Sequence, residues 1–176
     1  MEGAREAGGW PDAVGDTALT IRVPEADPLV RTGFPAHVTV LYPFVHESRI
    51  DAGTERELSD LFAGHDEFTL AFTEVGRYPG VLYLDPSPHA PVVALTEALV
   101  RCRPEAVPYR GVFGAGLPPH LTLAVSDGPA GRAAAHDAWE AVVTAALPVT
   151  CRVSDVRLIV WDGTRWQDRA AYRLRP

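Results

Sequence analysis

Hydrophobic and polar residues alternate with a period of two along several short stretches of this 176-residue chain, and such alternation predicts half-buried β-strands. The clearest example is 68–75, where Phe68, Leu70 and Phe72 alternate with Thr69, Ala71 and Thr73. Asp162-Gly163 predicts a tight hairpin turn. The predicted strands are 17–23, 36–44, 68–75, 81–84, 119–125, 149–161 and 165–174.

Three other stretches carry apolar residues at the spacing of a helix face. They are 50–63, 91–101 and 130–147. The second has Val92, Leu95 and Leu99 on one face, and the third has Trp139, Val142 and Val143. The segment 104–117 is rich in proline and glycine and reads as a loop.

Two of the predicted strands repeat one local pattern. Pro35-Ala36-His37-Val38-Thr39-Val40 is matched by Pro118-Pro119-His120-Leu121-Thr122-Leu123, with the histidines 83 residues apart. Side chains of a strand alternate between its two faces. Each strand should therefore bury its apolar pair and offer His and Thr together on the other face. Two imidazoles and two hydroxyls on one cleft suit acid–base chemistry on a phosphate.

The order of elements indicates a degenerate internal duplication, because each half has a motif strand, then a helix, then a hairpin. This order predicts a bilobal α+β fold. Two antiparallel sheets would be related by a pseudo-twofold, with helices on the outside and the active groove between the lobes. Residues 17–176 would form this single domain, and residues 1–16 a flexible tail.

Composition excludes several classes of function. The chain has no Lys, so a Walker-A loop, a lysine-adenylating ligase and Schiff-base catalysis are ruled out. Its net charge of −7 argues against extended nucleic-acid binding. We expect a monomer that contacts a small nucleotide or RNA end through a few arginines in a cleft. No apolar run is long enough to span a membrane, and no signal peptide is evident, so we expect a cytoplasmic protein.

Metal and thiol chemistry have weak support in the sequence. His37 and His120 would need further ligands to bind zinc, and no Cys or carboxylate repeats at a suitable spacing. We expect no metal and no cofactor. Cys102 and Cys151 read as reduced, buried or half-buried thiols. The remaining histidines lie beside charges or in turns, and we expect them to be solvated.

The motifs AHVTVLYPF and PPHLTLAV, together with VGRYPGVLYL between them, resemble those of the 2H phosphoesterase superfamily. The similarity covers roughly residues 17–176 and is strongest to the 2′-5′ RNA ligase-like and cyclic phosphodiesterase branch. It implies metal-independent opening of cyclic phosphates or 2′-5′ linkages, a role in RNA processing, and a reaction that in some members runs backwards as ligation.

The resemblance also implies roles for particular residues. His37 and His120 would be the acid–base pair, with His120 favoured as the base, and Thr39 and Thr122 would bind the phosphate. Relatives often carry Arg just after the second motif, where this chain has Val125. Arg77 and Arg110 are the candidate replacements.

Aromatic side chains near the motifs are candidates for stacking on a base. They are Tyr78, Tyr83, Tyr109 and Phe113, each of which could equally belong to the core. Tyr42 falls on the face opposite His37 in a regular strand, which predicts a core position.

Two other functions stay open at this point. One is a nucleotide- or phosphate-binding sensor that keeps the cleft without turnover, although neither motif is degraded. The other is a phosphoesterase of specialised metabolism. The leaving group, the base and the direction of the reaction are not fixed by the sequence.

Overall fold

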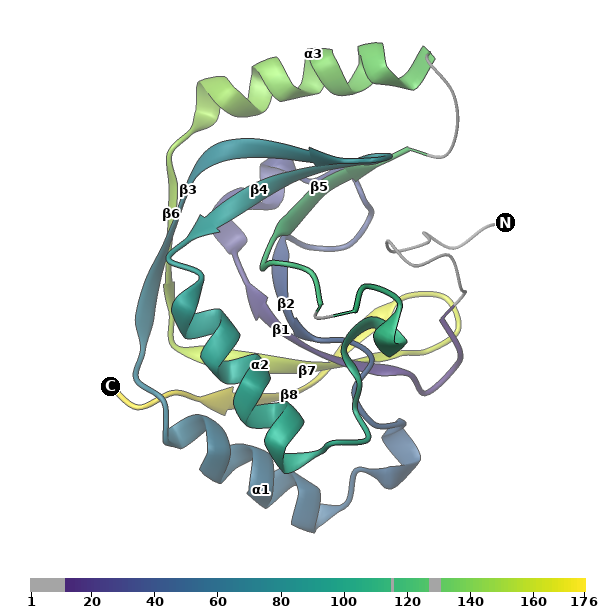
Figure 1. The fold of residues 1–176 in the computed structure, drawn as a ribbon, viewed down its shortest axis with the longest axis vertical. Helices are drawn as coiled ribbons and strands as arrows, with labels where there is room; N and C mark the ends of the chain where they lie inside the picture. The colour runs from purple at the N-terminus through teal and green to yellow at the C-terminus, as the bar shows by residue number, and fades with distance from the viewer. Residues whose placement is uncertain (1–11, 115, 127–130) are drawn as a thin grey trace.

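In the computed structural model, residues 12–114, 116–126 and 131–176 are described (Figure 1). Their helices and strands follow the predicted order closely. The strands are β1 (Thr17–Arg22), β2 (His37–Leu41), β3 (Phe68–Tyr78), β4 (Val81–Ser87), β5 (Leu121–Val125), β6 (Val149–Val153), β7 (Asp155–Trp161) and β8 (Trp166–Arg173). The helices are α1 (Ala52–Ala63), α2 (Ala90–Cys102) and α3 (Gly131–Ala146), with 3₁₀ turns η1 (Pro24–Leu29), η2 (Glu47–Arg49) and η3 (Pro108–Gly111).

The strands form one antiparallel sheet of eight, in the order β6-β3-β4-β5-β2-β1-β7-β8. The α+β class is confirmed, and the sheet curls strongly (Figure 1). The expected pair of separate sheets is a single sheet instead, because the two motif strands pair with each other at its centre. That join is narrow: β2 and β5 share one registered pair, Val38 with Leu121.

The single strand predicted over 149–161 is two strands with different partners. β6 pairs with β3 at one edge of the sheet, while β7 pairs with β1 and β8 in the other half. Ser154 separates them. The apolar positions are 149, 151 and 153 before Ser154 but 156 and 158 after it, so the phase of the alternation changes at this point and the prediction of one strand overlooked that signal.

The helices cover the face of the sheet that carries the apolar residues of the motif strands. Val38, Val40, Leu121 and Leu123 belong to the main core, with at most 3% of their surfaces exposed. Helix α2 packs on β2, α1 on β8 and α3 on β3. As predicted, Val92, Leu95 and Leu99 of α2 are buried. On α3, Val143 is buried but Val142 is 50% exposed, so the predicted apolar face of that helix is narrower.

The domain begins earlier than residue 17. The amide of Gly15 donates to the carbonyl of Trp161 (2.9 Å), and the amide of Trp161 donates to the carbonyl of Asp16 (2.8 Å). The Tyr42 hydroxyl donates to Asp12. Residues 12–16 are therefore hydrogen-bonded to the sheet rather than part of a free tail, and the rest of the predicted tail, 1–11, lies outside the described residues.

The two predicted cysteine environments are confirmed, with Cys151 buried and Cys102 half-buried, both as free thiols. Burial, followed by the nearby Glu25, raises the pKa of Cys151 to about 12. Across the described ranges, none of the helices has the length and apolar character needed to cross a bilayer.

Candidate active site

The pairing of Val38 with Leu121 determines how the two motifs meet. Because the strands are antiparallel, the residues on either side of this pair also lie opposite each other: His37 is opposite Thr122, and Thr39 is opposite His120. These four side chains point away from the core face that holds Val38 and Leu121. Cross-strand neighbours have Cβ atoms about 4.5–5.5 Å apart, and diagonal ones about 7–8 Å. The histidines therefore lie on a diagonal across one small patch of sheet.

A small cavity lies between the motifs and is lined by all four of their polar side chains. Its volume is about 20 Å³, enough for a water-sized group. The rest of the lining is Val81, Tyr109 and Val125. The four residues that the sequence singled out are thus brought together, each half-buried and accessible from one side.

Both histidines are oriented by the proline two residues before them. Nδ1 of His37 lies 2.8 Å from the carbonyl oxygen of Pro35, and Nδ1 of His120 lies 2.9 Å from that of Pro118. A carbonyl can only accept a hydrogen bond, so each Nδ1 must carry the proton and donate it. In a neutral imidazole this leaves the lone pair on Nε2, which is the nitrogen available for proton transfer to and from a ligand.

The surroundings of the two histidines differ. The Phe34 ring packs edge-on against His37, with ring centroids 4.7 Å apart. His120 instead meets a stacked pair, Tyr78 on Tyr83 (4.5 Å), with centroids 5.7 and 5.8 Å from the imidazole. Burial, followed by the neighbouring Tyr83, raises the pKa of Tyr78, so this phenol stays neutral. The two sides of the site are therefore chemically distinct.

The tyrosine pair depends on Gly76 in β3. Gly76 pairs with Tyr83 across the β3–β4 ladder. A Cβ atom built on Gly76 would lie 2.3 Å from Cζ of Tyr83 and 2.5 Å from its hydroxyl oxygen. Only a residue without a side chain leaves room for the Tyr83 ring to lie across β3 beneath Tyr78 and beside His120.

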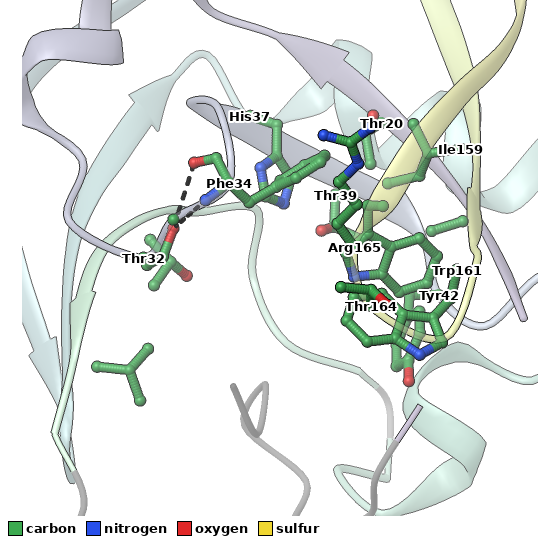
Figure 2. Close-up of a pocket in the computed structure, with 15 residues that line it drawn as sticks. Thr20, Thr32, Phe34, His37, Thr39, Tyr42, Ile159, Trp161, Thr164 and Arg165 are labelled. Carbon is green, nitrogen blue, oxygen red and sulfur yellow. Dashed lines mark hydrogen bonds between the residues drawn. The ribbon is translucent and has the colours of Figure 1, made fainter. Parts of the chain in front are cut away.

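A second, larger cavity, drawn in Figure 2, adjoins the first and is lined by His37 but not by His120. Its volume is about 190 Å³, and it shares His37, Thr39, Thr122 and Val125 with the small cavity. The added lining is mostly apolar and aromatic and comes from β1, β7, β8 and the loops next to them: Ala18, Thr20, Thr32, Gly33, Phe34, Tyr42, Ile159, Trp161, Thr164, Arg165 and Trp166.

Sequence reasoning missed this cavity wall. Trp161 and Trp166 flank the predicted Asp162-Gly163 turn, and they are a registered pair of the β7–β8 hairpin. That pairing could have been read from the sequence. The placement of β7 beside β1, which brings the hairpin to the motif strands, is a long-range contact that no local pattern specifies.

The two arginines proposed to neutralise the phosphate lie elsewhere. Arg77 forms ion pairs with Asp137 (2.6 Å) and Glu140 of α3, on the opposite face of β3 from Tyr78. Arg110 lies 3.3 Å from Asp16. Neither lines the two cavities, whereas Arg165, from the turn before β8, lines the larger one. Among the residues described, no carboxylate lines either cavity, and Arg165 interacts electrostatically with Asp162 of its own turn.

The four aromatic candidates do not all lie at the site. Tyr78, Tyr83 and Tyr109 lie at the site, while Phe113 lines neither cavity and packs edge-on against the Tyr109 ring, with centroids 5.6 Å apart. Tyr42 is buried as predicted, but on the cleft side. It lines the larger cavity and belongs to a small cluster with Ala18 and Ile159 rather than to the main core. The alternation breaks before Tyr42, because the β1–β2 register shifts between Thr39 and Leu41 and both Val40 and Leu41 are buried in the main core.

Metal ligation finds no support among the residues described. No three His, Cys, Asp or Glu side chains within the described ranges gather closely enough to hold an ion. The other histidines do not line the two cavities; His46 bonds with Ser48 (2.8 Å), and His89 with Asp85 (2.6 Å).

The paired motifs on one curled antiparallel sheet define the class of protein, a 2H-type phosphoesterase fold. A family model of the 2′-5′ RNA ligase superfamily matches residues 10–165. This chain therefore belongs to that superfamily, as the paired motifs indicated. No curated protein sequence matches it.

Solved structures share the fold at low sequence identity. LigT of Escherichia coli, crystallised with 3′-AMP, is 18% identical with a TM-score of 0.57, covering 92% of this chain and 99% of that one. The protein TT0787 of Thermus thermophilus is 17% identical with a TM-score of 0.57, covering 91% and 98%. A structure described as a phosphoesterase is 16% identical with a TM-score of 0.55, covering 93% and 100%.

Proposed function

We propose that this protein is a metal-independent phosphoesterase that opens a cyclic phosphodiester or a 2′-5′ linkage of a nucleotide or RNA end. The observation that carries the proposal is the cross-pairing of His37 with Thr122 and of Thr39 with His120 around one cavity. Two proton-transfer groups and two hydroxyl donors then surround a single phosphate.

In the proposed reaction one histidine takes a proton from water at its Nε2. The water oxygen attacks phosphorus, and the bond from phosphorus to a ribose oxygen breaks. The other histidine, protonated at Nε2, gives its proton to that departing oxygen. Nδ1 of each imidazole donates to a proline carbonyl throughout, so the ring does not turn as its charge changes.

The resemblance favours His120 as the base and His37 as the acid. The structural asymmetry fits this assignment, since the larger cavity adjoins His37. A leaving group that carries the rest of a nucleotide needs more room than an attacking water.

Negative charge that builds up on the phosphate oxygens would be stabilised by the hydroxyls of Thr39 and Thr122. The guanidinium of Arg165 would supply the positive charge that relatives often take from an arginine after the second motif, where this chain has Val125. Its place in the cavity wall and the lack of carboxylates in the described lining support this role.

The proposal extends to the symmetry of the sheet and to the oligomeric state. The two four-stranded halves of the sheet would be pseudo-twofold equivalents with the groove at their join. The net charge of −7 favours action on small nucleotides or RNA ends over binding along a nucleic acid. We also propose that the protein is a monomer in the cytoplasm.

The main competing function is a nucleotide-binding sensor on the same fold. Incubation with 2′,3′-cyclic nucleotides, followed by chromatography for a nucleoside monophosphate, tests between them. Product formation supports the phosphoesterase, and saturable binding without product supports the sensor. A broader panel of phosphodiesters would address the third possibility, an enzyme of specialised metabolism.

A further inference from the structure

A third cavity lies at the end of β5, between the loop that follows η1 and helix α3. Its volume is about 340 Å³. It adjoins the candidate active site in two ways. Val125 lines this cavity and both of the others, and Arg31 lines it while the next two residues, Thr32 and Gly33, line the larger of the other two.

A β-bulge explains how Val125 comes to face the active site. Thr122 and Ala124 pair with consecutive residues of β4, so Leu123 is an extra residue in β5. An extra residue shifts the alternation of side chains by one position. Leu123 and Ala124 therefore both belong to the core, while Val125 returns to the side of Thr122 and lines the same small cavity. The cleft thus continues along β5 to the third cavity.

Arg31 is held in a defined position at this third cavity. Its amide donates to the carbonyl of Leu123 (2.7 Å). Its guanidinium lies over the ring of Trp139 of α3, 3.5 Å from the ring centroid, and the indole Nε1 of Trp139 donates to the carbonyl of Leu29 (2.9 Å). Stacking occupies the face of the guanidinium and leaves the N–H donors at its edge for an anion.

The charge of Arg31 is not balanced by the carboxylates that the structure describes. The two nearest along α3, Asp137 and Glu140, both pair with Arg77 instead. Among the described residues, no Asp or Glu forms an ion pair with Arg31 or lines the third cavity. His136 of α3 also lines it and adds a ring N–H donor. The cavity is therefore suited to a negatively charged ligand.

The size and place of the cavity indicate which anion. Its volume of about 340 Å³ lies within the range of about 300–1,000 Å³ for ligand sites, so it has room for a phosphate together with the nucleoside that carries it. Val125 lies three residues along β5 from Thr122, about 10 Å. That distance is within reach of a nucleotide joined to the one whose phosphate Thr122 would bind.

We propose that the third cavity binds the neighbouring phosphodiester of an RNA end, with Arg31 as its main charged contact. The inference rests on the proposed function, because the first phosphate must lie between the two motifs. It narrows the substrate class to the end of an oligonucleotide, with at least two nucleotides bound, rather than a single nucleotide.

Binding measurements with two matched dinucleotides test this without relying on turnover. Both carry a 3′-phosphate, and the linkage between the nucleosides is either a charged phosphodiester or an uncharged methylphosphonate. A deoxyribose before the linkage prevents its cleavage. By calorimetry, the wild type should bind the charged dinucleotide about 10-fold more tightly, because a charge-assisted contact is present only there. Its affinity should also fall more steeply with salt, by about 0.7 in the logarithmic slope.

Arg31→Gln is the specific variant, because it removes the charge and keeps a polar side chain. It should bring the charged dinucleotide to within about 2-fold of the uncharged one, with the affinity for the uncharged one unchanged as a check that the site is intact. Arg31→Lys should keep part of the preference, since it retains the charge but not the planar donors. Arg56→Gln is the matched control at an exposed position of α1 and should alter neither affinity.

The outcomes separate this inference from the proposed function. Equal binding of the two dinucleotides by the wild type, or binding of neither, overturns the second phosphate site even if cyclic nucleotides are hydrolysed. A preference that survives in Arg31→Gln, or that Arg56→Gln reduces equally, overturns the role of Arg31. A preference that depends on Arg31, without hydrolysis of cyclic phosphates, supports the site and overturns the phosphoesterase.

Discussion

Val38 of β2 and Leu121 of β5 are registered partners, and each directly follows a motif histidine. This one pair joins the two halves of the sheet and sets the arrangement of the site. It buries two apolar side chains on the core face, so His37, Thr39, His120 and Thr122 are displayed together on the other face. A shift of one residue in this register would turn the His and Thr of one motif strand toward the core and separate them from those of the other.

Removing the motif hydroxyls should slow the reaction without unfolding the protein. Thr39→Val and Thr122→Val keep the side-chain shape and strand preference. Each should lower kcat by about 10- to 10³-fold, by analogy with the loss of one oxyanion donor. Steady-state kinetics alongside circular dichroism measure the effect. Near-normal turnover in both variants would mean that these threonines serve only the sheet.

Arg165 should be the arginine that matters for phosphate binding. Arg165→Ala should lower kcat/KM by about 10- to 10²-fold, because a charge-assisted contact to the phosphate is lost. Arg165→Lys should restore part of it. Arg77→Ala is the matched control. Because Arg77 is paired with α3, this variant should keep a kcat/KM close to that of the wild type. A larger loss at Arg77 than at Arg165 would reverse the assignment.

Gly76→Ala should disturb the His120 side of the site. The new Cβ would lie 2.3 Å from Cζ of Tyr83, so the ring must leave its stack with Tyr78. Overpacking of this kind destabilises by about 1–3 kcal/mol, and kcat should fall as His120 loses its support. Gly53→Ala in α1 is the control, since the new Cβ would lie 3.2 Å from its nearest neighbour, Oδ1 of Asp51, and needs only a small shift. Unchanged stability and kcat in Gly76→Ala would show that the tyrosine stack is not needed.

The turn that carries Arg165 should weaken in acid. The side chain of Gln167, followed by the amides of Arg165 and Thr164, holds the pKa of Asp162 at about 2, below its usual 3.8. A lowered folded-state pKa stabilises the fold above pH 3.8, and the contribution is lost as the pH falls toward 2. Asp162→Ala should therefore lower the free energy of unfolding at pH 5, and this difference should shrink by pH 2.

Urea unfolding at the two pH values measures this effect. Asp168→Ala, which removes another exposed carboxylate from β8, is the matched control. A difference between the wild type and Asp162→Ala that is equally large at pH 5 and pH 2 would contradict the assigned cause of the shift.

The local parts of the site could be predicted from the sequence. The His-apolar-Thr pattern specifies which side chains share a face, and its repetition specifies two such strands. The larger cavity could not be predicted in this way, because Trp161 and Trp166 reach His37 only through the pairing of β7 with β1. The break at Ser154 is different, because the phase of the alternation changes there and the sequence does carry the signal.

The choice of the arginine that lies at the site also depended on tertiary structure. The sequence offered Arg77, in the turn between the two motifs, and Arg110, in the loop before the second motif, as candidates. In the fold, carboxylates of α3 and Asp16 face them, while Arg165 comes to the cavity from 45 residues after His120. Ion-pair partners are set by tertiary packing, and nothing in the spacing of arginines reveals them.

The most direct test of the central claim is hydrolysis of a 2′,3′-cyclic nucleotide in saturating chelator. Phosphorus NMR would follow the wild type, His37→Ala and His120→Ala. We predict a nucleoside monophosphate product from the wild type at a rate that the chelator does not change. Each variant should lose about 10²- to 10⁴-fold in kcat, the usual effect of removing an acid or base. Activity that the chelator abolishes and zinc restores, or that survives the loss of either histidine, would contradict the account.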